Sequence, residues 1–386
     1  MDFRLGEHAD AFRAEVRAFL DEQMTPALEE HLYRTGVSND DGFTRALVAR
    51  GWFAPDWPGE LGGQDRHPLE VLVLDEELQR VDAPLYLSET TRMVCSIIRK
   101  IGTDQMKERV LMPALRGEVT IALGFSEPEA GSDVAAAKTR AVRDGDEWLI
   151  NGQKMFTTNG HIADYVLLLT RTNTAVAKHK GLTTFLVPTD RPGFEAQAVH
   201  TLSGERTNIT FYADLRLSDD WRIGPVDDGW GVMTLSLQDE HSAGWGQHLA
   251  RLVHHAEQWA RGATDIDGRA RIDDPAVRRR LARAATEVEI ATLLQRRSAW
   301  MAEEGIVPEA EGPMAKLFST ESLERAAQDL SELVGPDALR SYFESSAPEG
   351  GRIEHLLRFS PGTTIYAGTS EIQRNIIAQR GLGLPR

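Results

Sequence analysis

The segment Phe125–Asp133 contains the side chains best suited to hold a polar ligand. It leaves an extended stretch, turns at Pro128 and continues through small residues. The hydroxyls of Ser126 and Ser132, together with the exposed amides of such a loop, can donate hydrogen bonds to an anionic or carbonyl-rich ligand. Taken by itself, the segment is as compatible with a plain turn as with a binding loop.

A second segment, Asn151–Gly160, follows it along the chain. A β-turn at its start leads into a predicted strand, which ends in an aromatic side chain and two hydroxyls, those of Phe156, Thr157 and Thr158. By spacing alone, neither segment identifies a ligand.

The histidines His241, His248 and His255 recur every seven residues and could share one helix face, with Glu240 beside the first. Zinc-binding helices use pairs four residues apart, and seven residues of helix rise by roughly 10 Å. We therefore expect polar histidines on a helix face and no metal site. Glu240 by itself is most simply a solvated carboxylate in a polar cluster.

Nucleotide-binding glycine motifs are absent, since no G-x-G-x-x-G follows a predicted strand and no G-x-x-x-x-G-K-[ST] occurs. The glycines within residues 59–63 indicate a tight turn. These observations disfavour a Rossmann or P-loop protein. Cys95 is the only cysteine, so no internal disulfide can form, and we expect a small buried side chain in a reducing compartment.

The composition is that of an ordinary globular chain, with 41% hydrophobic and 26% charged residues. Its 386 residues correspond to about 2.6 domains of ~150 residues. The 43 basic and 59 acidic residues give a net charge of −16, which argues against general nucleic-acid binding, because such binding neutralises phosphates. The sequence shows no apolar run long enough to span a membrane and no signal-peptide layout, so we expect a soluble cytoplasmic protein.

Apolar spacing divides the chain into three segments that would position these motifs. We expect residues 1–118 to be helical, residues 119–228 to form an antiparallel β domain and residues 229–386 to be helical again. The strand-like runs of the middle segment are Trp148–Ile150, Tyr165–Thr170, Leu182–Val187 and Ile209–Leu217.

Together with Ile365–Ile376, the two segments described above resemble the acyl-CoA dehydrogenase family, flavoproteins that use FAD to desaturate acyl-CoA thioesters at the α,β position. The order of the motifs, their spacing and the helical–β–helical outline all agree, so the resemblance covers essentially the whole chain. It implies an α+β fold with an N-terminal helical domain, a middle antiparallel β-barrel-like domain and a C-terminal four-helix bundle.

The resemblance also implies a set of ligand contacts. FAD would lie against the β domain, with Ser126 bonded to the pyrimidine ring, Phe156 on the isoalloxazine face and Thr158 near N5. Further cofactor contacts are expected from Leu123, Phe125, Gly131, Ser132, Thr157, Thr369 and Glu371. Substrate contacts are expected from Ser132, Asp239, His241 and Gly368.

Desaturation needs a carboxylate that removes the α-proton while flavin N5 accepts the β-hydride, and it needs donors that polarise the thioester oxygen. Many family members place that glutamate in the C-terminal motif, where this chain has Ala367. A second branch places it on the first helix after the β domain, and Glu240 stands at the matching position. The resemblance thus implies Glu240 as the base, with the backbone N–H of Ala367 as a donor to the thioester oxygen. His241 stands where that branch usually has arginine.

Two elements that family members lend to a neighbouring subunit differ in this chain. The Arg-x-x-Phe-Gly element reads Thr264–Arg271, without the Arg and Phe, and the Gln-x-x-Gly-Gly element reads Glu332–Pro336. A carboxylate near a pyrophosphate is repulsive, and proline lacks an N–H donor. We therefore hypothesise an α2β2 heterotetramer in which a related subunit supplies FAD contacts, as in heteromeric actinobacterial members that degrade sterol side chains. A homotetramer with a modified phosphate site is the alternative.

The expected substrate is an acyl-CoA, with a weak preference for a bulky or branched acyl group such as a sterol side chain, and the expected electron acceptor is an electron-transfer flavoprotein. One alternative is a non-catalytic or half-site subunit that stabilises an active homologue. The intact segments around Ser126 and Thr158 argue against a subunit that binds no flavin. Another alternative keeps the fold but acts on substrates without CoA, as flavin oxidases and hydroxylases do.

Overall fold

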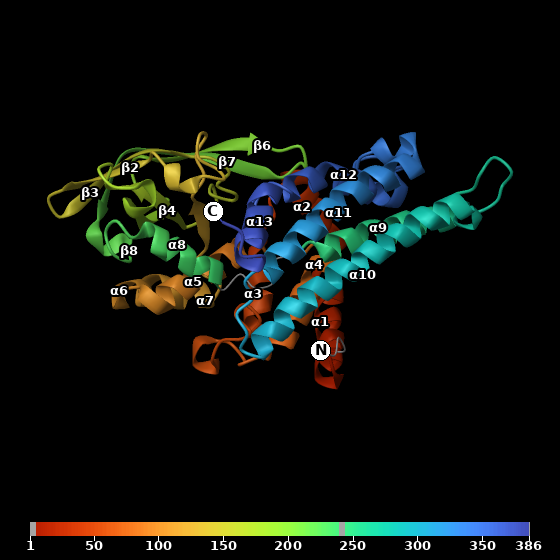
Figure 1. Cartoon of the computed structure of the whole chain (residues 1–386), viewed down its shortest axis with the longest axis horizontal. Helices are drawn as coiled ribbons and strands as arrows, with labels where there is room; N and C mark the ends of the chain where they lie inside the picture. The colour runs from red at the N-terminus through yellow and green to blue at the C-terminus, as the bar shows by residue number, and fades with distance from the viewer. Residues whose placement is uncertain (1–4, 239–243, 386) are drawn as a thin grey trace. The chain divides into compact units, whose positions relative to one another are not determined.

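The computed structural model of the chain describes residues 5–238 and 244–385. These residues form two compact units (Figure 1). One unit contains residues 25–66 and 84–238, and the other contains residues 5–24, 67–83 and 244–385. The described residues of segment 1–118, which we expected to form one domain, are thus divided between the two units.

The N-terminal segment is helical, as predicted. Its elements are α1 (Glu7–Gln23), α2 (Pro26–Thr35), α3 (Asp41–Ala49), the 3-10 helix η1 (Gly59–Leu61), α4 (Pro68–Arg80), α5 (Tyr86–Ile101), α6 (Asp104–Met106), the π-helical η2 (Lys107–Leu111) and α7 (Met112–Leu115). Local signals set several ends: the Asp40 carboxylate accepts the N–H of Phe43 at the start of α3, and Pro68 opens α4. Cys95 is fully buried in α5, and burial raises the pKa of its thiol to about 12.

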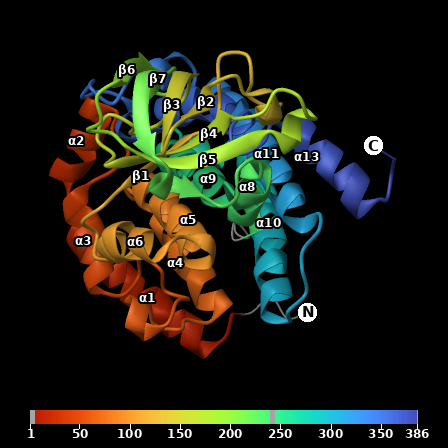
Figure 2. The same cartoon turned by 90° about the vertical axis from the view of Figure 1, so that its left-hand side faces the viewer.

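The middle segment forms an eight-stranded sheet in the order β6-β7-β3-β2-β4-β5-β8, with β1 paired to β4 outside this path (Figure 2). The strands are β1 (Ile121–Gly124), β2 (Arg140–Asp144), β3 (Glu147–Lys154), β4 (Tyr165–Arg171), β5 (Leu182–Pro188), β6 (Phe194–His200), β7 (Arg206–Ser218) and β8 (Arg222–Ile223). Short 3-10 helices occur between them, η3 (Val134–Ala136), η4 (Lys178–Lys180) and η5 (Asp219–Trp221). The predicted runs lie within β3, β4, β5 and β7, and the other strands have no counterpart among those runs.

The sheet is not purely antiparallel, which corrects our expectation. Strand β1 runs parallel to β4, with Ile121 opposite Tyr165 and Gly124 opposite Leu168. Parallel neighbours need a long connection, and the chain between these two strands contains β2 and β3. The remaining long pairings are antiparallel.

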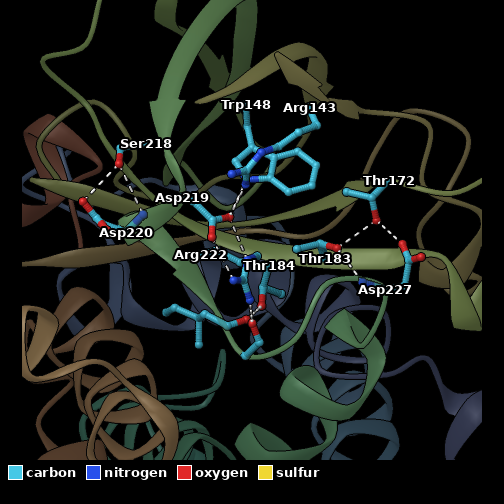
Figure 3. Close-up of polar contacts among 12 residues, drawn as sticks. Arg143, Trp148, Thr172, Thr183, Thr184, Ser218, Asp219, Asp220, Arg222 and Asp227 are labelled. Atoms are coloured by element: carbon cyan, nitrogen blue, oxygen red, sulfur yellow. Dashed lines mark hydrogen bonds and ion pairs between the residues drawn. The ribbon is translucent and has the colours of Figure 1, made fainter. Parts of the chain in front are cut away.

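Polar contacts around Asp219 join the edge strand β8 to strands β2 and β3 (Figure 3). Its Oδ1 accepts hydrogen bonds from Trp148 Nε1 at 2.7 Å and from Arg222 Nε at 2.9 Å, and it lies 2.9 Å from Arg143 Nη1. The Trp148 ring packs edge-on against Phe185 in the apolar core, with centroids 5.3 Å apart. The polar contacts therefore satisfy the indole N–H of a tryptophan whose ring serves the core.

The C-terminal segment is helical again, as predicted. Its elements are α8 (Gly229–Gln238), α9 (Gly246–Gly262), η6 (Arg271–Asp273), α10 (Pro275–Glu303), α11 (Glu311–Val334), η7 (Pro336–Leu339), η8 (Pro348–Gly351), α12 (Arg352–Thr363), α13 (Ser370–Ile376) and η9 (Ile377–Gly381). Helices α9, α10, α11 and α12 share one apolar core, so the predicted four-helix bundle is present. Buried positions spaced three and four residues apart, such as Leu249, Leu252 and Ala256, supply it.

Charged side chains join helices α1 and α4, which belong to the same unit as this bundle. Arg13 donates to Glu77 Oε1 and to Glu76 Oε2, both at 2.7 Å, and the two carboxylates are buried. Burial alone would raise the pKa of Glu77, but hydrogen bonds from Arg17, Arg13 and Arg80 lower it to about 2. Within the described ranges, no helix is long and apolar enough to cross a membrane.

Candidate active site

The loop that follows β1 is closed by its own backbone and anchored to β3. Glu127 and Ala130 exchange two backbone hydrogen bonds of 3.0 and 3.1 Å across the turn at Pro128. The carbonyl of Ser126 accepts the N–H of Met155 at 2.9 Å. The segment Phe125–Asp133 therefore forms a closed loop that is hydrogen-bonded to the segment Asn151–Gly160. The sequence alone did not decide whether this loop is ordered in this way.

A buried ion pair lies beneath this loop. Lys154, at the end of β3, is fully buried, and its Nζ donates to Glu127 Oε1 at 2.8 Å and to the carbonyl of Phe125 at 3.1 Å. Glu127 also accepts hydrogen bonds from the N–H groups of Lys138 at 2.6 Å and Thr139 at 2.9 Å, so both of its carboxylate oxygens are hydrogen-bonded. Burial lowers the pKa of Lys154 to about 8, while Glu127 acts in the opposite direction.

Above this pair, the loop leaves polar groups available. Ser126 is half-buried, Gly131 and Ser132 are exposed, and neither serine hydroxyl bonds to any described residue. Leu123 and Phe125 are half-buried and pack on the apolar core. These two residues therefore fix the start of the loop, and the two serine hydroxyls have no partner among the described residues, an arrangement that fits a carbonyl-rich ligand such as the flavin pyrimidine.

The turn after β3 presents an aromatic ring. Phe156 has a left-handed backbone with φ 61° and a ring that is 58% exposed. The N–H of Thr158 donates to the carbonyl of Phe156 at 3.0 Å, and its hydroxyl lies 3.1 Å from that of Thr207. An exposed aromatic face beside a half-buried hydroxyl fits the stacking of a flat cofactor.

Thr157 occupies a different place from its two neighbours. Its side chain is fully buried, and its hydroxyl lies 3.2 Å from that of Thr210. Its N–H donates to the carbonyl of Asn208, and its carbonyl accepts from the Asn208 side chain at 3.0 Å. Thr157 thus belongs to the support of this turn, and its polar groups are already used within the protein.

The C-terminal motif forms a turn before α13. Ala367 is exposed and left-handed with φ 52°, and Gly368 follows with φ 83°. The carbonyl of Ala367 accepts from Gln373 Nε2 at 2.9 Å, and that of Gly368 accepts from Lys316 Nζ at 2.7 Å. Thr369 caps α13 by accepting the N–H of Ile372. The turn carries no carboxylate at position 367.

A surface hollow of about 420 Å³ lies beside this turn. Thr369 and Glu371 line it together with Arg374, whose Nη2 lies 2.6 Å from Glu321 Oε1. Hydrogen bonds from its own backbone N–H and from Thr369 lower the pKa of Glu371. A hydroxyl and an arginine in one hollow fit a phosphate-bearing ligand, although the glutamates limit its positive charge.

Asp239, Glu240 and His241 lie outside the described residues. The chain leading to them is anchored, because Asp227 accepts from Thr172 Oγ1 at 2.5 Å and donates its N–H to Thr183 Oγ1 at 2.9 Å (Figure 3). These contacts join the start of α8 to strands β4 and β5.

His248 and His255 lie on one face of α9, and that face is buried. His248 Nε2 lies 3.8 Å from Asp82 Oδ1, and its ring stacks on Phe359 with centroids 5.1 Å apart. His255 Nδ1 lies 3.6 Å from Glu349 Oε2. Burial lowers the pKa of His248 to about 3 and that of His255 to about 4. Among the described residues, no group of three or more His, Cys, Asp and Glu is arranged to hold a metal ion.

Of the two elements thought to reach a neighbouring subunit, the first lies in an exposed turn between α9 and η6, and the second spans the C-terminal end of α11 and the start of η7. Asp265 and Arg269 close the first through a backbone hydrogen bond of 2.8 Å. Glu332 is exposed, and its Oε2 lies 3.7 Å from Arg280 Nη2. Arg280 therefore offsets part of the negative charge that we identified at this element.

Sequence reasoning missed the lysines that support both loops. Lys316 is buried on α11, one residue after Ala315 and on the face that carries Ser319, Thr320 and Leu323. A lysine inside the apolar stripe of a helix is the signal that could have identified it. The signal for Lys154 was weaker, because the alternation of inward and outward side chains along β3 is interrupted by the bulge at Gly152.

Comparison with known proteins gives a consistent match over the whole chain. Residues 6–118, 122–219 and 227–382 match the models of the N-terminal, middle and C-terminal domains of acyl-CoA dehydrogenase. The acyl-CoA dehydrogenase FadE26 of Mycobacterium tuberculosis is 35% identical over 98% of this chain and 97% of its own length.

Two solved structures are similar at 32% identity over 100% of both chains. They are the Tcur3481-Tcur3483 steroid ACAD, with a TM-score of 0.92, and the ChsE4-ChsE5 complex from Mycobacterium tuberculosis, with a TM-score of 0.90.

Proposed function

The chain belongs to the acyl-CoA dehydrogenase family of FAD-dependent flavoproteins, oxidoreductases that act on CH–CH bonds, and we propose that Glu240 is the base that removes the α-proton of its acyl-CoA substrate. The observation that carries this proposal is the C-terminal turn. It presents backbone groups but has a methyl group, that of Ala367, where a carboxylate base would otherwise stand.

Bound FAD would supply the acceptor for the β-hydride. In this proposal Ser126, Phe156 and Thr158 hold the flavin, while Thr369 and Glu371 lie toward its phosphates. The N–H of Ala367 donates to the thioester oxygen, which stabilises the negative charge that develops there as the α-proton leaves. The role of the chain is thus to place a base and an oxygen donor around one carbon.

The described chain before Glu240 supports this role. Helix α8 is described as far as Gln238, and the Asp227 contacts with Thr172 and Thr183 hold the segment before that helix on the sheet. An anchored element can position a catalytic group more precisely than a free loop. His241 would support its charge in place of an arginine, and Asp239 and Gly368 would contact the substrate.

For the substrate, we propose a bulky or branched acyl group such as a sterol side chain. Support comes from one solved structure that is similar over the full chain, the Tcur3481-Tcur3483 steroid ACAD. Electron-transfer flavoprotein is the proposed electron acceptor, and the cytoplasm the proposed location.

We further propose an α2β2 assembly with a related subunit that supplies FAD contacts. Support comes from the exposed Glu332 and from the segment Thr264–Arg271, which lacks the Arg and Phe expected there. Further support comes from two similar solved structures, the Tcur3481-Tcur3483 steroid ACAD and the ChsE4-ChsE5 complex, each of which is named for two proteins. The same observations favour a second candidate, a half-site subunit in which this chain binds flavin but a partner provides the base.

The deciding experiment replaces Glu240 by Gln in the FAD-loaded assembly and measures turnover with a panel of acyl-CoAs. Loss of a general base lowers kcat by about 10²–10⁴-fold, and flavin content should stay unchanged. Glu257→Gln is the matched control, since Glu257 is a surface residue paired with Arg261. Unchanged turnover in Glu240→Gln would rule out this base and favour the half-site role.

A further inference from the structure

The turn at Ala367 and Gly368 is unusual in its backbone. Two successive residues are left-handed, with φ 52° and 83°. Glycine adopts this conformation freely, whereas the Cβ of alanine makes it unfavourable. A Cβ at position 368 would come within 2.7 Å of Gln373 Nε2, so the turn is also tightly packed against that side chain. Something outside the turn must therefore hold Ala367 in place.

Two side chains take the carbonyl groups of the turn. Gln373 Nε2 donates to Ala367 O at 2.9 Å, and Lys316 Nζ donates to Gly368 O at 2.7 Å. Because peptide groups are planar, holding these two carbonyls orients the peptide planes on either side of Gly368, and the first of these planes also sets ψ of Ala367. The N–H groups of Ala367 and Gly368 donate to no described residue, so both remain available.

Lys316 has little else to bond in the described chain. Its side chain is 2% exposed, its one described hydrogen bond goes to Gly368, and it forms no ion pair with a described carboxylate. Its Nζ lies 5.8 Å from the centroid of the Trp245 ring. Burial lowers the pKa of Lys316 to about 8, against the opposing effects of Glu321 and Glu371. An ammonium group buried without a bonded carboxylate is costly for a fold, so its retention points to a local task.

We propose that Lys316 and Gln373 are positioning residues that hold the Ala367–Gly368 turn with its N–H groups directed to the substrate thioester oxygen. This rests on the donor role of Ala367 in the proposed function. Neither residue touches the reacting atoms, and both act through the turn. Without either one, a peptide plane beside Gly368 is released, so the turn can move and its N–H groups lose their aim.

The test measures polarisation of a bound thioester, which requires neither turnover nor a base. The probe is the CoA thioester of a para-dimethylamino-substituted cinnamic acid, whose absorption band shifts to longer wavelength as its carbonyl oxygen accepts stronger hydrogen bonds. The FAD-loaded assembly is titrated with this probe in the wild type and in Lys316→Met, Gln373→Met and Glu240→Gln. Lys107→Met, an exposed lysine of η2, is the matched control.

We expect Lys316→Met and Gln373→Met each to lose at least half of the red shift and to lower kcat/KM about 10- to 100-fold, mainly through kcat. Lys316→Arg should restore part of both. Glu240→Gln and Lys107→Met should keep the full shift. A full shift in both methionine variants would overturn the inference while leaving the donor role intact. No shift in the wild type would overturn the donor role itself.

Discussion

Two buried lysines each support a loop to which the proposed function assigns ligand contacts, and they differ in one respect. Lys154 in the sheet unit and Lys316 in the bundle unit each donate to a loop carbonyl, at 3.1 Å to Phe125 and 2.7 Å to Gly368. Burial lowers the pKa of each to about 8. Lys154 also pairs with a buried carboxylate, that of Glu127, whereas no described carboxylate pairs with Lys316.

Because of this difference, we expect Lys154 to stabilise the fold and Lys316 to orient the turn at Gly368. Removing Lys154 leaves Glu127 buried without its cation, which penalises the folded state strongly. Removing Lys316 leaves the Gly368 carbonyl with only the longer hydrogen bond of 3.4 Å from Gln373 Nε2, a smaller and more local loss. Removal of Lys154 from the sheet unit should therefore mainly lower stability, whereas removal of Lys316 from the bundle unit should mainly lower turnover.

The largest expected effect comes from Lys154→Met. We expect it to lower the free energy of unfolding by about 3–5 kcal/mol, because it leaves a buried uncompensated charge. Urea unfolding followed by circular dichroism measures this. The double variant Lys154→Met/Glu127→Gln should recover part of the loss. Lys138→Met, which removes an exposed partner of Glu129, should cost about 0.5 kcal/mol or less. A loss below 1 kcal/mol for Lys154→Met would contradict the folding role.

An intermediate effect is expected on acidification of the bundle unit. The folded pKa values of His248 and His255, about 3 and 4, lie below the ordinary value of 6.5. The unfolded chain therefore binds more protons between pH 6.5 and about 4, and stability falls as pH falls through that window, by up to about 1.4 kcal/mol per pH unit for each histidine.

Amide hydrogen exchange at pH 7 and pH 5 tests this difference between the units. Exchange is expressed as protection relative to the intrinsic amide rate, which itself falls as pH falls. Protection in α9 should decrease from pH 7 to pH 5 more than protection in β4 and β5. His248→Gln should reduce that decrease, and His31→Gln, at an exposed histidine of α2, should not. An equal decrease in both units would show that the buried histidines do not set the acid response.

The smallest expected effect is that of Lys316→Met on stability at pH 7, about 1 kcal/mol or less, because the cost of the lost hydrogen bond is offset by relief of a buried charge. The folded pKa of about 8 lies below the ordinary 10.5, so this lysine favours folding increasingly as pH rises from 8 toward 10.5. The wild type should therefore gain on the variant over that range in thermal melts. A constant gap would mean that Lys316 titrates alike in both states.

Much of the fold was accessible from local patterns. The helical–β–helical order follows from the change in apolar period, and the stripes of α9 and α11 follow from spacings of three and four residues. The motifs around Ser126, Phe156 and Ala367 indicated the family, which the comparisons confirm. These features are local because each depends on residues that are neighbours along the chain.

Other features depend on residues far apart in the sequence, and only the folded chain decides them. The parallel pairing of β1 with β4 and the inward position of Thr157 both depend on distant strands. Composition treats Lys154 and Lys316 as ordinary surface lysines. The fold buries each one beneath a loop, since Glu127 lies 27 positions from the first and Gly368 lies 52 from the second. Long-range packing, which local periodicity does not encode, turns two common charges into supports of two loops, one in each unit.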